Sequence, residues 1–233
     1  MAVRVALFGA TGRMGTRIAA LAEGDESVRI ARLVGRSEAV DGDASHSAVD
    51  VIVDFSSESG TRRAIAEARA CGAALLVGTT GLSAEILREL AELGRTNAVL
   101  VAPNTSLGVA VTRKLARLAA QLLGPSGPGG GAWSVDIVES HHDRKKDAPS
   151  GTAIAIARAL ESGGMAVPSD RIHAIRAGDT IGEHEIRLAG PSERIHVMHQ
   201  AVTRDLFAAG ALRAARWLAG RPAGSYTMDD VLG

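Results

Sequence analysis

The chain has 233 residues, of which 46% are hydrophobic, and its 26 basic side chains balance its 26 acidic ones. This length can bury the core of one or two domains, and zero formal net charge gives no global attraction for nucleic acid or an anionic membrane. The single cysteine, Cys71, excludes an internal disulfide, and no apolar run approaches the roughly 20 residues of a membrane span. We therefore expect a cytoplasmic protein with neither nucleic acid nor a membrane as a partner.

The N-terminal residues predict a strand, a glycine-rich turn and a helix. An apolar stretch over 3–8 leads into a turn over 9–15, and helical spacing follows over 16–23. Glycines in such a turn let the backbone approach a pyrophosphate, whose charge then lies at the helix N-terminus. The spacing is Gly-x-x-Gly-x-x-Gly, and a turn without a ligand is the alternative. The pattern favours a dinucleotide site that includes Gly9, Thr11, Gly12, Arg13, Met14 and Gly15.

The end of the second expected strand, over 30–34, bears on which nucleotide is bound. A site for NADH places a carboxylate about 20 residues past the glycine turn to accept from the ribose 2′-hydroxyl. This chain has Gly35 there, followed by Arg36 and Ser37, which offer a guanidinium and a hydroxyl to a 2′-phosphate. Glu38 lies close by, and a solvated Arg36 is the alternative. We predict that NADPH is preferred and that NADH is accepted.

Three more apolar strands are expected, over 51–55, 73–77 and 98–101, with helices over 59–71 and 83–93. This alternation predicts an α/β fold with a doubly wound parallel sheet of Rossmann type. Ligands of such sheets lie beyond the carboxyl ends of the strands, so the loops after the strands should face the cofactor. These loops carry Phe55-Ser56-Ser57, Gly78, Thr79, Thr80, Ala102, Pro103 and Asn104, for which a polar strand-end turn is the alternative.

The pattern changes after Asn104. A long helix is expected over 109–123, a glycine-rich surface loop over 124–131, a strand over 134–138 and a helix over 152–160. Alternation with period two over 183–188 and 194–201 indicates a sheet covered on one face, and helical spacing returns over 204–219.

The run from Glu139 to Thr152 carries most of the chemistry. It places two imidazoles, His141 and His142, and two ammonium groups, Lys145 and Lys146, ahead of a helix start that Ser150 can cap. Imidazole exchanges a proton near neutral pH, and a helix N-terminus attracts anions, so the run offers an acid beside a site for carboxylate. A solvated basic loop is the alternative.

A metal site is a weaker interpretation of the paired histidines. They match no common zinc spacing, and Cys71 lies far away in the sequence, so we predict no metal. Four further histidines are expected to be packed or hydrogen-bonded rather than to bind a ligand. These are His173, His184, His196 and His199.

Together the glycine turn and the histidine run resemble those of the dihydrodipicolinate reductase family, NAD(P)H-dependent enzymes of the diaminopimelate route to lysine. The resemblance covers nearly the whole chain, and His141-His142 to Gly151-Thr152 is its most specific part. Further family-like segments are Val77–Gly81, Ala102–Asn104, Arg176–Asp179, Gly182–His184, Arg204–Leu212 and Met228–Gly233. The resemblance implies a dinucleotide-binding domain over 1–106 and 204–233. It also implies an α+β substrate-binding and oligomerisation domain over 107–203, whose sheet mediates a homotetramer.

The resemblance further implies reduction of 4-hydroxy-tetrahydrodipicolinate, or its dehydrated form, to tetrahydrodipicolinate. His141 would be the proton donor and Lys145 a second acid or charge stabiliser, although the sequence leaves open which of them delivers the proton. His142, Gly151 and Thr152 would bind a carboxylate of a small dicarboxylate substrate. The alternatives are a non-catalytic nucleotide sensor of Rossmann type and a related oxidoreductase acting on another small acid. A sensor would not need an acid beside a carboxylate site.

Overall fold

The computed structural model describes residues 1–36, 39–41, 49–129 and 132–233. Ser37 and Glu38, which enter the prediction of cofactor preference, lie outside these residues, as does the end of the expected glycine-rich loop. The chain forms two compact units, Met1–Leu107 with Asp205–Gly233, and Gly108–Arg204. The sequence-based boundaries fall after residues 106 and 203. In the described ranges, no helix is both long enough and apolar enough to cross a membrane.

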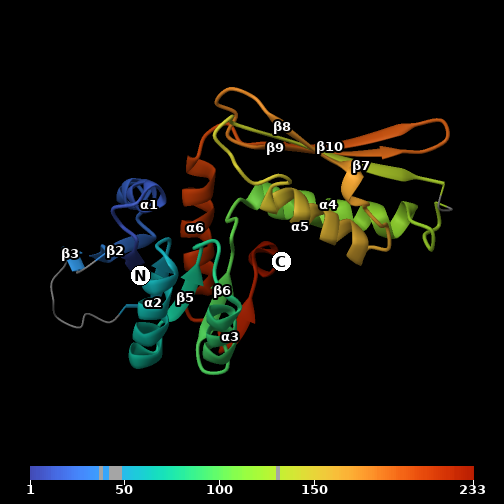
Figure 1. The fold of residues 1–233 in the computed structure, drawn as a ribbon. Coiled ribbons are helices and arrows are strands. Elements are labelled where there is room, and N and C mark those ends of the chain that lie inside the picture. The colour runs from blue at the N-terminus through green and yellow to red at the C-terminus, as the bar shows by residue number, and fades with distance from the viewer. Residues whose placement is uncertain (37–38, 42–48, 130–131) are drawn as a thin grey trace. The chain divides into compact units, whose positions relative to one another are not determined.

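The first unit is built on a seven-stranded sheet with the order β11-β6-β5-β4-β1-β2-β3. Neighbouring strands pair in parallel, except that β3 runs antiparallel to β2. The strands are β1 (Val3–Phe8), β2 (Val28–Val34), β3 (Ala39–Asp41), β4 (Val51–Asp54), β5 (Ala74–Val77), β6 (Ala98–Val101) and β11 (Gly224–Tyr226). The helices are α1 (Arg13–Glu23), α2 (Glu58–Cys71), α3 (Ala84–Leu93), α6 (Asp205–Leu218) and α7 (Met228–Leu232), as Figure 1 shows.

Helices cover both faces of this sheet because its central strands are apolar on both sides. Every residue of β4 and β5 is buried. Ile52 and Leu75 share a core cluster with α2 and α3, whereas α1 and α6 pack on each other and α6 contacts β1, β4 and β5. The prediction of a doubly wound α/β sheet is confirmed, and the carboxyl ends of its strands meet at one edge.

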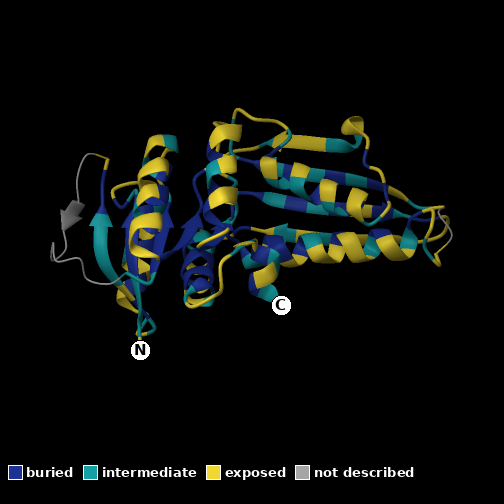
Figure 2. Cartoon of the chain, turned by 90° about the horizontal axis from the view of Figure 1, so that it is seen from below, coloured by how far each residue is buried: buried dark blue, intermediate teal, exposed yellow. Residues whose placement is uncertain are grey.

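The second unit is a mixed sheet with helices on one face. Its order is β10-β9-β7-β8, in which β7 and β8 are parallel and the other pairs are antiparallel. The elements are α4 (Leu107–Leu123), β7 (Ser134–His141), α5 (Gly151–Ser162), a 3₁₀ turn (Ser169–Arg171), β8 (Ile172–Arg176), β9 (Glu183–Ala189) and β10 (Arg194–Gln200). Ile137 and Ile186 pack against α4 and α5, and Figure 2 shows how burial alternates with exposure in this unit.

Two features of the second unit differ from expectation. Strand β7 does not end at Val138 but continues to His141, because Ser140 pairs with Glu183 and His141 with Arg176. Strand β8 was not predicted at all. It lies at the sheet edge with an exposed centre, so its sequence carries no alternating pattern. The additional pairing places His141 on a strand rather than in a loop.

Candidate active site

The glycine turn of the first unit is imposed by close backbone contacts. Gly9 has φ +77°, and a Cβ there would lie 2.2 Å from the carbonyl oxygen of Phe55. A Cβ at Gly15 would lie 2.2 Å from the carbonyl oxygen of Gly9. Gly12 is the N-cap of α1, which has no side-chain cap and no acidic residue in its first turn. Such a helix start accepts the oxygens of a phosphate.

Helix α1 begins earlier than the sequence suggested. Arg13, Met14 and Gly15 form its first turn, whereas the turn was expected to extend to residue 15. Thr11, Gly12 and Arg13 are exposed, Met14 is half-buried and Gly15 is buried. The predicted residues therefore divide into those exposed to a ligand and those that pack the turn.

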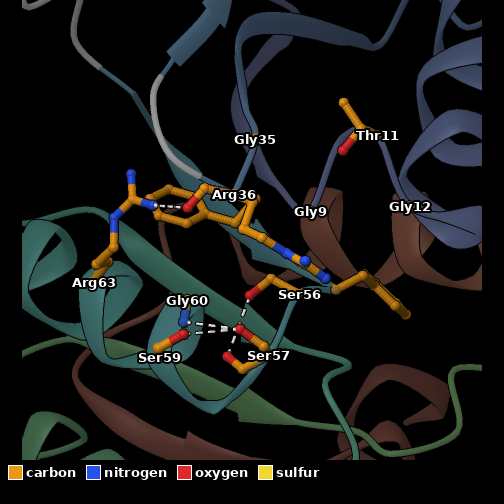
Figure 3. Close-up of a pocket in the computed structure, with 12 residues that line it drawn as sticks. Gly9, Thr11, Gly12, Gly35, Arg36, Ser56, Ser57, Ser59, Gly60 and Arg63 are labelled. Atoms are coloured by element: carbon orange, nitrogen blue, oxygen red, sulfur yellow. Dashed lines mark hydrogen bonds between the residues drawn. The ribbon is translucent and has the colours of Figure 1, made fainter.

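A pocket lies beside this turn, at the carboxyl ends of β1, β2 and β4 (Figure 3). Its lining comprises Phe8, Gly9, Thr11, Gly12, Gly35, Arg36, Phe55, Ser56, Ser57, Ser59, Gly60 and Arg63. Three segments predicted to face a cofactor, 9–12, 36 and 55–57, thus meet at one place. Among the described residues, the lining does not include 78–80 or 102–104.

Two arginines line this pocket. Arg36 is exposed, and its carbonyl accepts a hydrogen bond of 3.2 Å from Nη1 of Arg63. Figure 3 shows both arginines above the serine-rich turn that starts α2, with the Arg36 side chain extending away from the Arg63 guanidinium. Sequence reasoning missed Arg63, because only the packing of α2 beside the end of β2 brings it here.

The residues that follow β5 contact the turn after β4, which lines the pocket. Thr79 donates to the buried carboxylate of Asp54 at 2.9 Å and accepts from the backbone N–H of Ser56 at 2.9 Å. Burial raises the pKa of Asp54, against the opposing hydrogen bonds from Ser56, Thr61 and Thr79. A Cβ at Gly78 would lie 2.3 Å from the Phe55 ring. Gly78 and Thr79 thus shape the turn after β4.

The other predicted cofactor residues lie at the ends of β5 and β6. Thr80 and Pro103 are exposed, and Ala102 is buried, with its N–H bonded to Val77. The side-chain oxygen of Asn104 accepts from the backbone N–H of Ser106 at 2.9 Å.

The second unit contains a buried charge cluster around Glu139. This carboxylate is fully buried and contacts Nδ1 of His141. It also accepts from the backbone N–H of Ser150 at 3.1 Å and from Nη1 and Nη2 of Arg176 at 3.0 and 2.9 Å. Each oxygen of Glu139 therefore has two partners, as a buried charge requires.

Strand geometry explains why these residues meet. Glu139 and His141 are two residues apart, so their side chains lie on one face of β7. In the parallel pairing with β8, His141 lies opposite Arg176, and in the antiparallel pairing with β9, Glu139 lies opposite His184. Strand β8 thus delivers a cation to this carboxylate, and β9 places an imidazole opposite it.

The ionisation of the cluster follows from its burial. Burial by itself would raise the pKa of Glu139, but hydrogen bonds from Arg176 and His141 hold that pKa below its usual value. Burial lowers the pKa of His141, and the charges of Lys145 and Arg176 act in the same direction, while Glu139 opposes them. Glu139 is therefore the anion of the cluster.

Lys145 lies on a tight turn beside the cluster. Its Nζ binds both oxygens of Asp147, at 2.8 and 2.7 Å, and its backbone N–H donates to the carbonyl of His142. The Arg176 guanidinium also donates to the carbonyl of Lys145 at 3.3 Å and to that of Asp147 at 2.6 Å. One arginine thus contacts both the turn and Glu139.

Helix α5 starts at the same place. Ser150 is its N-cap and accepts from the N–H of Ala153 at 3.2 Å. Gly151 is exposed, and a Cβ there would meet nothing within 4 Å, while Thr152 is half-buried. The first turn therefore has room for an anion beside it.

His184 supports this helix start from the sheet. Its Nε2 lies 3.0 Å from Oγ of Ser150, and its ring packs edge-on against His141 at 5.2 Å between centroids. Burial lowers the pKa of His184 to about 4. His184 is therefore packed and hydrogen-bonded, as expected. His142 is half-buried, and its Nδ1 has no hydrogen-bond partner within the described part of the chain.

Family models and sequence relatives identify the family of this chain. The family model described as dihydrodipicolinate reductase, N-terminus, matches residues 3–105, and the model described as dihydrodipicolinate reductase, C-terminus, matches residues 108–232. The chain belongs to the dihydrodipicolinate reductase family. The assignment made from the glycine turn and the histidine run is confirmed, and neither alternative is favoured.

Relatives of this reductase chain cover nearly its full length. The 4-hydroxy-tetrahydrodipicolinate reductase of Stenotrophomonas maltophilia (strain R551-3) is 42% identical over 243 residues, 99% of this chain and 98% of the relative. That of Syntrophobacter fumaroxidans is 38% identical and covers 99% of both chains. The dipicolinate-bound dihydrodipicolinate reductase from Paenisporosarcina sp. TG-14 superposes with a TM-score of 0.78 over 97% of this chain and 98% of that one. At 22% identity, this likeness shows a shared fold.

Proposed function

We propose that this protein reduces 4-hydroxy-tetrahydrodipicolinate, or its dehydrated form, to tetrahydrodipicolinate in the diaminopimelate route to lysine. The observation that carries the proposal is the buried Glu139–His141–Arg176 cluster beside the start of α5. It combines an imidazole with a helix N-terminus, which suits protonation of a substrate bound through its carboxylates. Relatives of that name cover nearly the full length of the chain.

His141 and Lys145 are the proposed proton donors. When bound, a nicotinamide nucleotide supplies a hydride, and the protein must supply a proton to the reduced ring. Since Nδ1 of His141 contacts Glu139, its Nε2 is the nitrogen that can exchange a proton with substrate. Lys145 is the second acid or charge stabiliser, and its contact with Asp147 is solvent-accessible enough to be exchanged for substrate.

The substrate carboxylates are proposed to bind at the start of α5. The N–H of Gly151 and the N–H and hydroxyl of Thr152 are the donors there, and His142 completes the site. Ser150 is already engaged by Glu139, His184 and Ala153, so it holds the helix start in place. The absence of a side chain at Gly151 keeps the approach open.

A nicotinamide nucleotide is the proposed hydride donor, bound by the first unit. Its residues fit a pyrophosphate because Gly12 caps α1 without a side chain and no acidic residue lies in the first turn. Backbone groups of Gly12, Arg13 and Met14 would hold the phosphates, with Thr11 beside them. The remaining contacts are assigned to Gly78, Thr79, Thr80, Ala102, Pro103 and Asn104.

NADPH is the proposed preferred nucleotide, with NADH accepted. Arg36 and Arg63 line the same pocket beside the glycine turn and present two guanidinium groups to a 2′-phosphate. Ser57 and Ser59 add hydroxyl groups to the lining of the same pocket.

A homotetramer formed through the sheet of the second unit is also proposed. The sheet face opposite α4 and α5 leaves Ile175 47% and Met198 57% exposed. Light scattering on the purified protein measures the assembly directly, and a monomer at micromolar concentration would contradict it. The cytoplasmic location stays a prediction.

The activity is tested in one coupled assay. Dihydrodipicolinate synthase generates the substrate in situ, and loss of reduced nucleotide is followed at 340 nm for NADPH and NADH separately. Turnover that requires both the synthase and this protein supports the proposal. Nucleotide binding without turnover would instead favour a sensor, and turnover only with another small acid would favour a related oxidoreductase.

A further inference from the structure

We propose that Arg176 is a positioning residue that fixes both proton donors of the reductase by holding Glu139 and the Lys145 turn with one guanidinium. The inference rests on the proposed function and concerns a residue on the one strand of this sheet that sequence patterns did not predict. It assigns to Glu139 and Arg176 a role in the reaction beyond balancing each other's charge.

Apart from a bond to the neighbouring carbonyl of Ile175, the hydrogen bonds of Arg176 divide between Glu139 and the Lys145 turn. Nη1 and Nη2 bind the two oxygens of Glu139 at 3.0 and 2.9 Å, while Nε and Nη2 bind the carbonyls of Lys145 and Asp147 at 3.3 and 2.6 Å. The first set orients His141 through Glu139, and the second fixes the turn that carries Lys145. A planar group with five donors can serve both, whereas an ammonium cannot span them.

Glu139, held by Arg176, in turn orients His141 and the start of α5. Its Oε2 contacts Nδ1 of His141, and its Oε1 accepts from the N–H of Ser150. Because Glu139 stays a carboxylate, it holds a proton on Nδ1 of His141, so the proton that the ring gives to substrate is the one that its protonated form carries on Nε2. Gly182 lies next to this nitrogen. A Cβ at position 182 would lie only 3.1 Å from Nε2, so the glycine leaves Nε2 accessible.

Three variants test the proposal. Arg176→Lys keeps the positive charge but loses the planar guanidinium that binds both oxygens of Glu139. Glu139→Gln keeps the shape of the side chain but loses its negative charge. Because a single change can leave a buried charge unpaired and unfold the unit, the double variant Glu139→Gln/Arg176→Met replaces the pair with neutral groups of similar size. Arg158→Met, on the exposed face of α5, is the matched control.

We expect each of the three variants to lose about 100-fold in kcat, since misplacing a reacting group by about 1 Å has that effect. The KM for NADPH should stay parental, because that site belongs to the first unit. A purely structural role predicts instead that the double variant, once folded, recovers the parental kcat. Recovery of kcat in the folded double variant, or in Arg176→Lys, would overturn the proposal.

The pKa of His141 provides a readout that does not need turnover. The groups facing it are Glu139, which raises its pKa, Lys145 and Arg176, which lower it, and the ring of His184. Glu139→Gln should therefore lower the pKa of His141, and a fourth variant, the single change Arg176→Met, should raise it. The shifts are followed by NMR titration of the ring protons, assigned with His141→Asn.

The two readouts separate the possible failures. Opposite shifts of the His141 pKa together with an inactive parent protein would reject the reductase function but keep the contacts of Arg176. An active parent whose kcat and His141 pKa are insensitive to both changes would reject the positioning role and keep the function. Arg158→Met should alter neither quantity.

Discussion

The candidate site of the first unit of this reductase consists mainly of backbone groups, whereas that of the second consists mainly of side chains. In the first unit, glycines and a helix start form the site, and the functional groups are largely backbone N–H groups. In the second, a fully buried carboxylate gathers an imidazole, a guanidinium and a helix N-cap. A backbone site is encoded by a contiguous stretch, whereas a site made of side chains depends on which strands become neighbours.

This difference has an energetic counterpart. Removing one partner from a buried ion pair leaves an uncompensated charge and costs several kcal/mol, whereas exposed groups around a pocket contribute about 1 kcal/mol or less each. Substitutions in the second unit should therefore affect turnover and stability strongly. Substitutions of exposed side chains in the first should affect mainly nucleotide preference.

The largest expected effect is on turnover. His141→Ala and Lys145→Ala should each lower kcat by ~100 to 10,000-fold, because a general acid contributes on that scale. Nucleotide affinity, measured by fluorescence titration, should stay parental. Lys146→Ala, an exposed neighbour, is the control. If both variants kept near-parental kcat, the assigned roles would be wrong. If nucleotide affinity fell as much as kcat, the two residues would not act separately from the nucleotide site of the first unit.

The next effect is on stability as the pH falls. Burial lowers the pKa of His184 to about 4 from its ordinary 6.5, so the unfolded chain binds a proton that the folded one excludes. The contribution is complete above pH 6.5 and declines towards pH 4, by roughly 3 kcal/mol in the free energy of unfolding. Burial depresses the pKa of His141 with the same sign. His184→Gln should remove most of this pH dependence.

The two tryptophans allow the pH dependence of the free energy of unfolding to be measured separately in each unit. Trp133 packs on the core of the second unit, and Trp217 lies on α6 of the first. In a Trp217→Phe background, urea titrations at pH 7, 5.5 and 4.5 report the second unit alone. In a Trp133→Phe background they report the first, whose described residues include no histidine. An equal decline in both units would contradict the assignment to His184.

An intermediate effect is expected at the substrate carboxylate. Thr152→Val keeps the shape but removes a hydroxyl, and losing one hydrogen bond to a charged group costs ~1.5 to 3 kcal/mol, about tenfold to a hundredfold in affinity. Calorimetry with pyridine-2,6-dicarboxylate, a planar dianionic mimic, should show this loss. The affinity for NADPH should not change. Unchanged affinity for the mimic would move the carboxylate site elsewhere.

The smallest effect is expected at the arginines of the nucleotide pocket. Arg36→Ala and Arg63→Ala should each raise the KM for NADPH by up to about tenfold, because the guanidinium groups are exposed and screened. The KM for NADH should not change. Arg62→Ala is a matched control, since Arg62 pairs with Glu85 and Glu89. A parent that prefers NADH, or unaltered NADPH kinetics in Arg36→Ala, would reject the assignment.

The sequence by itself determined the features that depend on neighbouring residues in the chain. The glycine turn, the buried parallel strands and the N-cap Ser150 of α5 follow from local spacing and chain geometry. The shared face of Glu139 and His141 does not, because the strand was expected to end at Val138 and pairing with β8 and β9 extends it to His141. The motifs around them also sufficed to identify the family.

Only the tertiary structure decided which distant residues complete each site. Arg176 reaches Glu139 because β8 pairs in parallel with β7 in one register, and shifting that register by one residue would turn Arg176 to the other face. Arg63 reaches Arg36 because α2 packs beside the end of β2. The pairing of strands and helices depends on burying the whole core, a sum over many residues that no short stretch of sequence contains.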